Sequence, residues 1–266
     1  MTFIGPSTDP VTRTILVLYV ADSLLKTEDQ MRNTQIDAPS ESENASSKTL
    51  HEKVPAYARI RQSLRAEYDW ETINAILDTA LVAHVGFIDE GRPMVIPMAF
   101  ARIGRRIYIH GAKATRIVKK GRNANPVSIT VTHVDGIVCA RSAFHTSFNY
   151  RSAVLHGTAQ AVTEKAEKLT ALEAITNHIL PDRWSELRQA TSKEITATGV
   201  WALDIEHAAA KVRQGLPNDD EEDYGVPVWG GVVPVVTGLG LPIDDGRLAP
   251  ETPASQAVVK ARKKFA

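Results

Sequence analysis

The chain has 266 residues, 43% of them hydrophobic and 23% charged, which is typical of a folded globular protein with a sizeable core. Lys plus Arg and Asp plus Glu both number 31, so the net charge gives no reason to expect nucleic acid or an anionic membrane as a partner. The single cysteine, Cys139, excludes a disulfide framework and a cysteine-based metal site, and it fits a cytoplasmic location.

The first 50 residues read as an extension that precedes the folded part. Thr14–Ala21 is apolar, but it is much shorter than the roughly 20 residues that a helix needs to cross a bilayer. The stretch Asn33–Lys48 is polar and rich in serine, and such a composition favours disorder. We therefore predict a disordered extension over residues 1–50 and no membrane-spanning segment.

The folded part begins near Tyr68 with signals for a helix and a hairpin. Asp69 is a good N-cap residue, and apolar residues follow it at helical spacing, at positions 70, 73, 76, 77 and 80. The run Ala80–Ile88 then reads as a strand. Asp89-Glu90-Gly91 reads as a hairpin turn that leads into a second strand, Pro93–Ile103.

A short predicted strand, Ile107–His110, is followed by a glycine turn and a basic segment. This segment brings together the hydroxyl of Thr115 and the cations of Arg116, Lys119 and Lys120. A helix that begins here would offer free N–H groups to an anion, and the planar guanidinium of Arg116 suits a phosphate. Taken alone, the segment is more typical of a solvated basic helix that joins two strands.

The rest of the chain continues the β pattern. By the same signals we predict strands at Val127–Val134, Ile137–Ala140 and Tyr150–Val162, a tight turn at Asp135-Gly136, a helix over Glu164–Leu180, and a last strand over Thr198–Ile205. Six or seven antiparallel strands with two helices indicate a mainly β fold with flanking helices (α+β). Because closure removes exposed edges, the sheet is expected to form a closed or partly closed barrel.

Several short motifs, found in one order between about Val54 and Leu248, resemble a known family. The motifs are Pro93-Met94-Val95-Ile96-Pro97, His110-Gly111-Ala112 with Thr115-Arg116, Asp135-Gly136 before Ile137–His145, Asn149-Tyr150-Arg151-Ser152, Lys211–Gly215, Asp219–Asp223 and Trp229. Together they are similar to the flavin-nucleotide-binding proteins of the pyridoxamine 5'-phosphate oxidase-like family. The nearest resemblance is to its nitroimidazole-resistance (Nim-type) branch.

The resemblance implies an antiparallel split β-barrel that forms a homodimer and binds FMN in a groove between the subunits. The chain would then divide into a split-barrel domain at 54–215, a Pro/Gly-rich segment at 216–250 that packs on the barrel, and a basic tail at 251–266. The expected partners are a second copy of the chain and a small-molecule substrate, with no nucleic acid and no membrane.

The resemblance also indicates which residues would bind FMN. Thr115 and Arg116, with Lys119 or Lys120 in support, would hold the phosphate. The other positions are Val95, Ile96, Pro97 and Met98 against the flavin ring, His110 and Gly111 before the phosphate segment, and Ser142, Tyr150, Arg151 and Ser152. Tyr150 and Ser152 share one face of their predicted strand, so Arg151 points to the other face. Arg151 would there bind phosphate or brace the interface.

His145 is the predicted catalytic residue, since a loop histidine beside a flavin can donate a proton to the reduced ring or to a substrate oxyanion. The alternative is a loop histidine that only forms hydrogen bonds. His84, His133 and His156 lie within predicted strands and are expected to be structural. No histidine pair has the spacing of a zinc protease motif, so no metal site is predicted.

Three functions remain open from the sequence. The first is an FMN-dependent oxidoreductase that acts on a nitroaromatic or related small molecule, with the flavin supplying the redox chemistry. The second is a flavin carrier or sensor without turnover, and the third is a split barrel that binds haem or a deazaflavin. Pyridoxamine phosphate oxidation is not expected, because the C-terminal Arg-x-His pair of those oxidases is not found. The chain also lacks a GxGxxG fingerprint for a fixed nicotinamide site.

Overall fold

The computed structural model describes residues 54–112, 125–249 and 251–265, all of which belong to one compact unit. The predicted extension at residues 1–50 and the predicted phosphate-binding residues Thr115, Arg116 and Lys119 lie outside this part of the chain. The description below therefore concerns the sheet, its helices and the C-terminal region.

The described part is built on one antiparallel sheet. Its strands are β1 (Ala66–Glu67), β2 (Ala83–Asp89), β3 (Arg92–Met98), β4 (Phe100–Ile103), β5 (Arg106–Ala112), β6 (Asn125–Cys139), β7 (Ser147–Ala161), β8 (Thr198–Arg213) and β9 (Gly231–Pro234). Their order is β3-β2-β6-β7-β8-β5-β4, with β1 paired to β8 and β9 paired to β6. The expected mainly β, antiparallel split-barrel architecture is confirmed.

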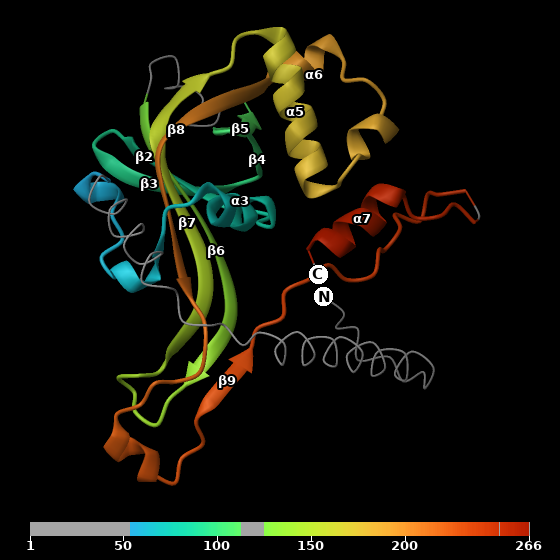
Figure 1. Cartoon of the computed structure of the whole chain (residues 1–266). Coiled ribbons are helices and arrows are strands. Elements are labelled where there is room, and N and C mark those ends of the chain that lie inside the picture. The colour runs from blue at the N-terminus through green and yellow to red at the C-terminus, as the bar shows by residue number, and fades with distance from the viewer. Residues whose placement is uncertain (1–53, 113–124, 250, 266) are drawn as a thin grey trace. The chain divides into compact units, whose positions relative to one another are not determined.

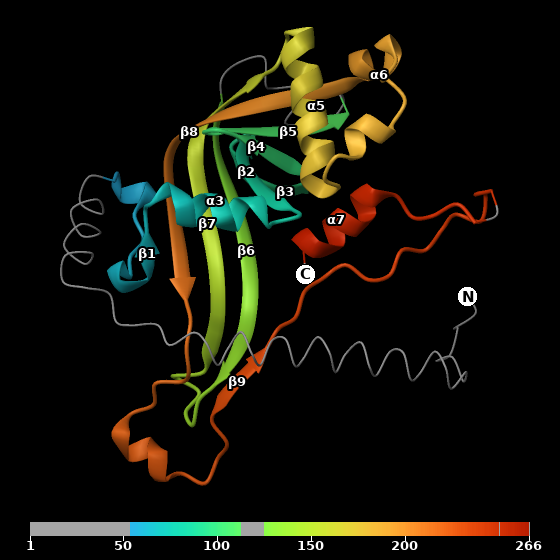
Figure 2. The same cartoon turned by 45° about the vertical axis from the view of Figure 1, so that its right-hand side comes forward.

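Within the described residues, four α-helices flank the sheet: α3 (Trp70–Asp78), α5 (Lys165–Ile179), α6 (Ser192–Ala197) and α7 (Gln256–Lys264). Short 3₁₀ turns lie at Ala56–Ala58 (η1), Ser63–Arg65 (η2), Arg183–Glu186 (η3) and Glu221–Gly225 (η4). Figures 1 and 2 show β6, β7 and β8 as long, curved neighbouring strands, with α5 and α6 at one end and β9 at the other. Among the described residues, no helix combines the length and apolar character needed to cross a membrane.

Local signals explain the first helix and hairpin. The Asp69 carboxylate accepts a hydrogen bond from the Thr72 amide at 2.7 Å, which caps α3, and the helix buries Ile73, Ile76 and Leu77 on one face. Between β2 and β3, Glu90 and Gly91 both have positive φ (52° and 73°). Two positive φ values are what a tight two-residue hairpin turn requires, so the predicted turn is confirmed.

The predicted tight turn at Asp135-Gly136 is wrong. β6 runs through both residues to Cys139, with only a register shift against β7 between Val134 and Gly136. A glycine is needed there because β9 pairs closely on the other side: a Cβ on Gly136 would lie 2.9 Å from a methyl carbon of Val232. A distant strand, rather than a local turn, therefore accounts for this glycine, and the β6–β7 connection comes later, at residues 140–146.

The last long strand, β8, extends to Arg213 and so passes well beyond the predicted end at Ile205. Its pairing with β7 shifts by one residue where His156 lies opposite His207 and Gly157 lies opposite Ile205. A side chain at Gly157 could not be accommodated, because its Cβ would lie 2.1 Å from the Asp204 carbonyl oxygen. This irregularity interrupts the alternating pattern from which strands are predicted.

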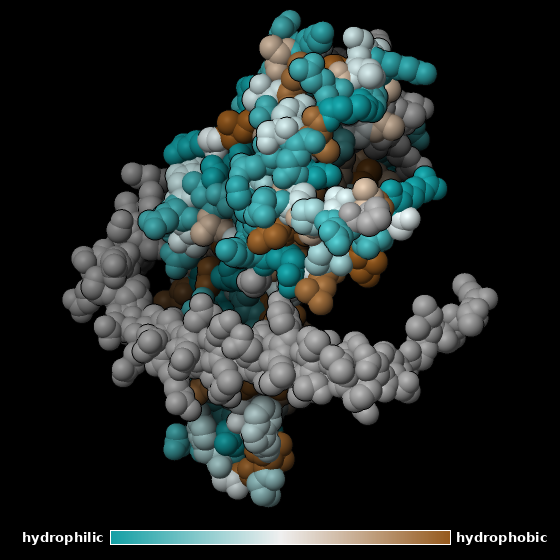
Figure 3. Space-filling view, turned by 90° about the vertical axis from the view of Figure 1, so that its right-hand side faces the viewer, coloured by the Kyte–Doolittle hydropathy of each residue, from teal (hydrophilic) through white to brown (hydrophobic). Residues whose placement is uncertain are grey.

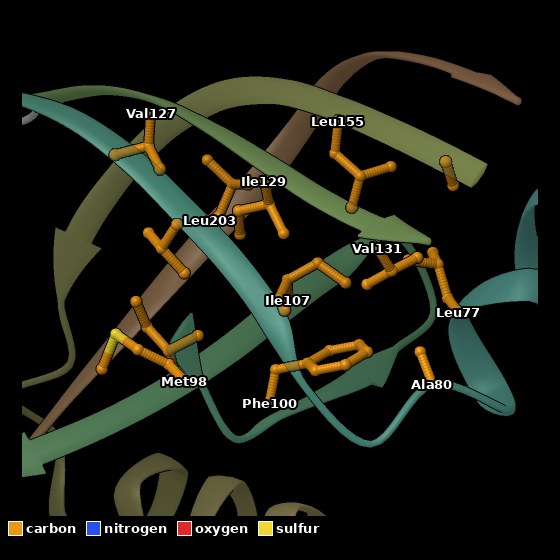
Figure 4. Close-up of a cluster of buried hydrophobic side chains, with 14 of the residues drawn as sticks. Leu77, Ala80, Met98, Phe100, Ile107, Val127, Ile129, Val131, Leu155 and Leu203 are labelled. Atoms are coloured by element: carbon orange, nitrogen blue, oxygen red, sulfur yellow. The ribbon is translucent and has the colours of Figure 1, made fainter. Parts of the chain in front are cut away.

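The core lies inside the curved sheet, where side chains from most strands meet. Figure 4 shows Phe100 and Ile107 pointing toward Val131 and Leu155, with Leu77 and Ala80 closing one side. A second apolar layer lies on the other face of β5 and β8, where Tyr108, Val200 and Ala202 pack against α5. β5 and β8 are thus covered on both faces.

The basic C-terminal residues include a packed helix. In α7, Ala257 and Ala261 are buried, and the ammonium of Lys264 donates a hydrogen bond to the carbonyl oxygen of His178 at 2.6 Å. His178, near the end of α5, donates from its ring to the Ala80 carbonyl oxygen at 2.7 Å. The region expected as a basic tail therefore contains a helix that is hydrogen-bonded to α5 at His178. His178 is in turn hydrogen-bonded to Ala80.

Candidate functional site

A groove of about 470 Å³ lies on the outer face of the sheet. Its walls are mostly apolar where β2, β3 and β6 line it and polar where β7 and β8 line it. The lining residues are Tyr57, Gly86, Phe87, Ile88, Pro93, Met94, Val95, Pro126, Val127, Ser128, His156, Gly157, Thr158 and Glu206. An apolar groove with a few convergent polar groups is the usual form of a small-molecule site.

The strand β3 divides the predicted ring-facing residues between two environments. Val95 is 63% exposed and lines the groove, and Pro97 is exposed as well. Ile96 packs against the core, and Met98 is buried in it. Because β3 ends the path of the described sheet, one side of its backbone has no neighbouring strand, and the prolines fit that edge. Of the four β3 residues predicted to face the flavin ring, Val95 and Pro97 are the two whose side chains are available to a ligand outside the barrel.

The polar wall of the groove was not recognised from the sequence. His156, expected to be structural, lines the groove, and its ring lies 5.2 Å from that of Tyr57. Burial, followed by the nearby His207, lowers the pKa of His156, so its ring is neutral near pH 7. Thr158 donates a hydrogen bond to the Glu206 carboxylate at 2.8 Å. The sequence hint is that polar residues occupy alternate positions toward the end of β7, at His156, Thr158 and Gln160.

A second cavity, of about 180 Å³, lies between β5, α5 and α6. His110 lines it, because Ile107 and Ile109 take the core-facing positions of β5 and His110 projects to the other side. The Nδ1 atom of His110 is buried without a hydrogen-bond partner, and burial lowers the pKa of the ring. His110 is therefore a neutral imidazole with an unused nitrogen beside a cavity lined by Leu172, Ile175, Trp184 and Ile195.

The groove and the His110 cavity lie at the two ends of the predicted phosphate segment. The chain leaves β5 after Gly111 and Ala112, next to His110, and enters β6 at Asn125-Pro126, where Pro126 lines the groove. The residues expected to hold the phosphate, Thr115, Arg116 and Lys119, belong to the segment between these points. In the sequence these three residues lie between His110, which lines one cavity, and Pro126, which lines the other. They are outside the described residues.

On β7, the structure separates Arg151 from its neighbours. The Arg151 guanidinium donates two hydrogen bonds to the Asp135 carboxylate, at 2.8 and 3.0 Å, and this pairing raises its pKa above the ordinary value. Tyr150 and Ser152 point to the opposite face. There the Lys211 ammonium lies 5.5 Å from the Tyr150 ring, and Ser152 donates to the Lys211 carbonyl oxygen at 3.3 Å. This pair lies within one chain and joins β7 to β6, so both predicted roles of Arg151, phosphate binding and bracing of the subunit interface, stay predictions.

His145 and Ser142 come together in the β6–β7 connection, where the Ser142 hydroxyl accepts a hydrogen bond from the His145 amide at 3.3 Å. The His145 ring lies 3.2 Å from the Asp220 carboxylate, and neither His145 nor Ser142 lines either cavity. Within the described residues, the groups around the predicted catalytic residue are therefore an acidic segment and Phe144, which is 90% exposed.

The acidic segment at 219–223 folds back on this connection through an ion pair that sequence analysis did not identify. Asp219, whose side chain is fully buried, accepts from the Arg141 amide at 2.8 Å and from its guanidinium at 3.0 Å. Burial opposes the charge of Asp219, but the hydrogen bonds from Arg141 outweigh it and lower the pKa of Asp219. Arg141 also lies over the Tyr224 ring at 4.9 Å, so one arginine fixes both ends of this turn.

Comparison with known families identifies the fold. The sequence profile of the pyridoxamine 5'-phosphate oxidase family matches residues 69–212. Among proteins with curated functions, none matches the chain.

Three solved structures illustrate the relationship. The flavocytochrome Anf3 from Azotobacter vinelandii is 39% identical, with a TM-score of 0.73 over 77% of this chain and 96% of its own. An FAD- and haem-binding protein from Mycobacterium smegmatis is 34% identical, with a TM-score of 0.71 over 74% of this chain and 97% of its own. A proposed 5-nitroimidazole antibiotic resistance protein from Bacteroides thetaiotaomicron is 24% identical, with a TM-score of 0.48 over 55% and 86%.

The profile match extends from the α3 cap to β8, and so includes the His110 cavity and every residue of the groove except Tyr57. The first two structures cover 77% and 74% of this chain and nearly their own full lengths. This chain belongs to the flavin-binding, pyridoxamine 5'-phosphate oxidase-like family of split β-barrels.

Proposed function

We propose that the protein is a flavin-dependent oxidoreductase that acts on a small organic molecule, such as a nitroaromatic compound, at a site completed by two copies of the chain. The observation that carries this proposal is the open, largely apolar groove along the edge strand β3, in a member of a flavin-binding family. The flavin supplies the redox chemistry, and the chain's own residues bind and orient the reactants.

The proposed cofactor site combines described and sequence-derived parts. Val95 and Pro97 are exposed on β3 and would contact the flavin ring, while Thr115 and Arg116, supported by Lys119, would bind the phosphate nearest to it. This arrangement holds the flavin mononucleotide portion, which FMN and FAD share. FMN is the form expected from the sequence, and the Mycobacterium smegmatis relative is named as an FAD-binding protein.

The proposed homodimer is supported by apolar side chains on the outer face of β6 and β7. Ile137 and Phe148 lie directly opposite each other on these strands and are 40% and 54% exposed. Val134, opposite Tyr150, is also exposed, so the apolar positions continue along the same ribbon. Figure 3 shows hydrophobic residues among hydrophilic ones on one face of the molecule. A cytoplasmic location is part of the same proposal and is compatible with the free thiol of Cys139.

The test begins with an absorbance spectrum of the purified protein and of two variants, Arg116→Ala and the matched control Arg247→Ala, whose side chain is exposed. We expect flavin absorbance in the wild type and in Arg247→Ala, and its loss in Arg116→Ala. A wild-type protein that neither carries flavin nor binds added FMN or FAD would contradict the proposal. Turnover distinguishes an enzyme from a carrier: a nicotinamide donor should bleach the bound flavin, and a nitroaromatic acceptor should restore its absorbance.

A second candidate function is a flavocytochrome, in which the same chain also binds haem. Two relatives with more than 30% identity are named for such a combination: one is a flavocytochrome, and the other is an FAD- and haem-binding protein. A histidine that ligates haem iron does so through a ring nitrogen that carries no proton; His110 has a buried Nδ1 without a hydrogen-bond partner, and burial lowers the pKa of its ring. The rings of His133, His145 and His178 already have hydrogen-bond partners. The His110 cavity is smaller than a porphyrin, so the proposal assigns His110 the axial contact only.

The haem candidate predicts a Soret band in protein that has been supplied with haem. His110→Ala should lose this band and keep the flavin absorbance, whereas the control His84→Ala, at an exposed position of β2, should keep both. A Soret band of unchanged position and intensity in His110→Ala would exclude His110 as the ligand.

A further inference from the structure

The outer face of the β7–β8 ribbon carries cations that form no ion pair with any of the described residues. Tyr150 lies directly opposite Arg213, and Ser152 lies directly opposite Lys211. Residues in direct register point to the same side of a sheet, so these four side chains share one face. We call Tyr150, Ser152, Lys211 and Arg213, with the neighbouring Arg65, the cation face.

The polar contacts of the cation face leave its charges uncompensated. The Arg213 guanidinium donates a hydrogen bond to the neutral side chain of Asn149, and Lys211 faces the Tyr150 ring. Among the described residues, none of Arg65, Lys211 and Arg213 forms an ion pair. Burial, and then the like charge of Arg65, lowers the pKa of Arg213. Elsewhere in the described part Arg102, Arg106, Arg141 and Arg151 all have carboxylate partners.

The guanidinium of Arg213 is held in one position by its neighbours, as is favourable for a group that binds a ligand. Asn149 is buried, and its amide nitrogen donates to the Gly215 carbonyl oxygen at 3.0 Å while its amide oxygen accepts from Arg213. The backbone turn after β8 thus orients Asn149, and Asn149 orients the guanidinium. Pairing of β1 with β8, in which Ala66 lies opposite Lys211, places Arg65 at the edge of the same region. A guanidinium that is held in place before binding loses less entropy when it binds an anion.

We propose that the cation face binds the diphosphate of an adenine dinucleotide. Two or three cations without acidic neighbours match the two negative charges of a diphosphate, and a guanidinium can bind phosphate oxygens in a bidentate manner. Tyr150 and Ser152 add an aromatic ring and a hydroxyl on the same face. The inference rests on the proposed function, because either the flavin itself, as FAD, or a nicotinamide dinucleotide donor would supply this diphosphate.

The test measures binding of ADP to the purified full-length protein by calorimetry at low and high salt. Lys211→Gln and Arg213→Gln should each weaken ADP binding by about tenfold, as expected for loss of one charge-assisted hydrogen bond. Lys263→Gln and Arg247→Gln remove equal charges from exposed positions elsewhere and should leave the affinity unchanged. Lys211→Gln is the more informative variant, because Arg213→Gln also removes a partner of Asn149.

The same variants show which molecule, FAD or a nicotinamide dinucleotide, supplies the bound diphosphate. If FAD affinity falls about tenfold while FMN affinity is unchanged, the cation face binds the adenylate phosphate of the flavin's own diphosphate, beyond the phosphate assigned to Thr115 and Arg116. If both flavins bind as before and the KM for NADH rises about tenfold with kcat unchanged, it binds the donor. Both outcomes support the inference. Equal ADP affinities in the wild type, Lys211→Gln and Arg213→Gln would overturn it, and wild-type binding of FMN in that same experiment would show that the flavin assignment stands independently.

Discussion

At the scale of single residues, three neutral histidines occupy different surroundings that follow from strand alternation and packing. His110 and His156 border cavities, whereas His178 of α5 bonds through its ring to Ala80, two residues after α3, and through its carbonyl oxygen to Lys264 of α7. Burial is the main cause that lowers the pKa of all three. Stability should therefore depend on pH in the range where histidine titrates.

We expect the free energy of unfolding to decrease as the pH falls below about 6.5, the ordinary histidine pKa. The unfolded chain binds a proton at His178 more readily than the folded chain, because burial disfavours the charged ring, with Lys264 nearby adding repulsion. One such group contributes at most about 1.4 kcal/mol for each pH unit. Thermal unfolding at pH 5.5 and 7.5 measures the effect. His178→Gln, which can still donate to Ala80, should reduce the dependence, and an unchanged dependence in this variant would refute the assignment.

At the scale of elements, the chain divides into segments whose signals are local and segments whose structure depends on distant partners. The α3 helix belongs to the first kind, since a cap and an apolar stripe within a dozen residues define it. The β9 strand belongs to the second kind, since its pairing with β6 determines both its own conformation and the need for Gly136.

The cap of α3 gives a prediction at this scale. Asp69→Ala removes the acceptor of the Thr72 amide and should lower the free energy of unfolding by about 1 kcal/mol, as measured by urea titration. Asp69→Asn keeps a capping oxygen and should remain close to the wild type. Equal destabilisation by both substitutions would indicate that the carboxylate charge, rather than the cap, is the important feature.

Sequence reasoning succeeded where a short window carried the signal. The Asp69 cap, the turn at Asp89-Glu90-Gly91 and the strand that begins at Thr198 were all predicted from neighbouring residues. It failed at Asp135-Gly136, where a typical turn pair lies inside a long strand, and at β8, where a bulge broke the alternation. The full extent of β8, which brings Lys211 and Arg213 beside β7, was therefore missed.

The candidate site shows the same division. The opposite orientations of Tyr150 and Arg151 follow from alternation along one strand and could be predicted. The partners of those side chains, Lys211 and Asp135, come from neighbouring strands whose register no short window specifies. The groove formed by His156, Thr158 and Glu206 likewise arises only when β7 and β8 pair with a shift.

At the scale of the whole molecule, the described unit exposes an apolar pair, a group of cations and a strand edge that a second copy of the chain could cover. Phe148, Tyr150 and Ser152 alternate along the outer face of β7, which joins an apolar pair, Phe148 with Ile137, to the cation face. Across the sheet, β3 has a free edge with Val95 exposed. A second copy that covers the apolar pair would exclude water from the ligand-binding surfaces nearby.

The central claim, a flavin bound at a site completed by two chains, is tested most directly by analytical ultracentrifugation monitored at the flavin absorbance. We predict that flavin sediments with a particle of two chains, at one flavin for each chain. Phe148→Asp, which introduces a charge into the apolar pair, should sediment as a single chain that has lost its flavin. The control Phe144→Asp, at the exposed tip of the β6–β7 connection, should remain a flavin-loaded dimer. A single chain that keeps its full complement of flavin would contradict the account.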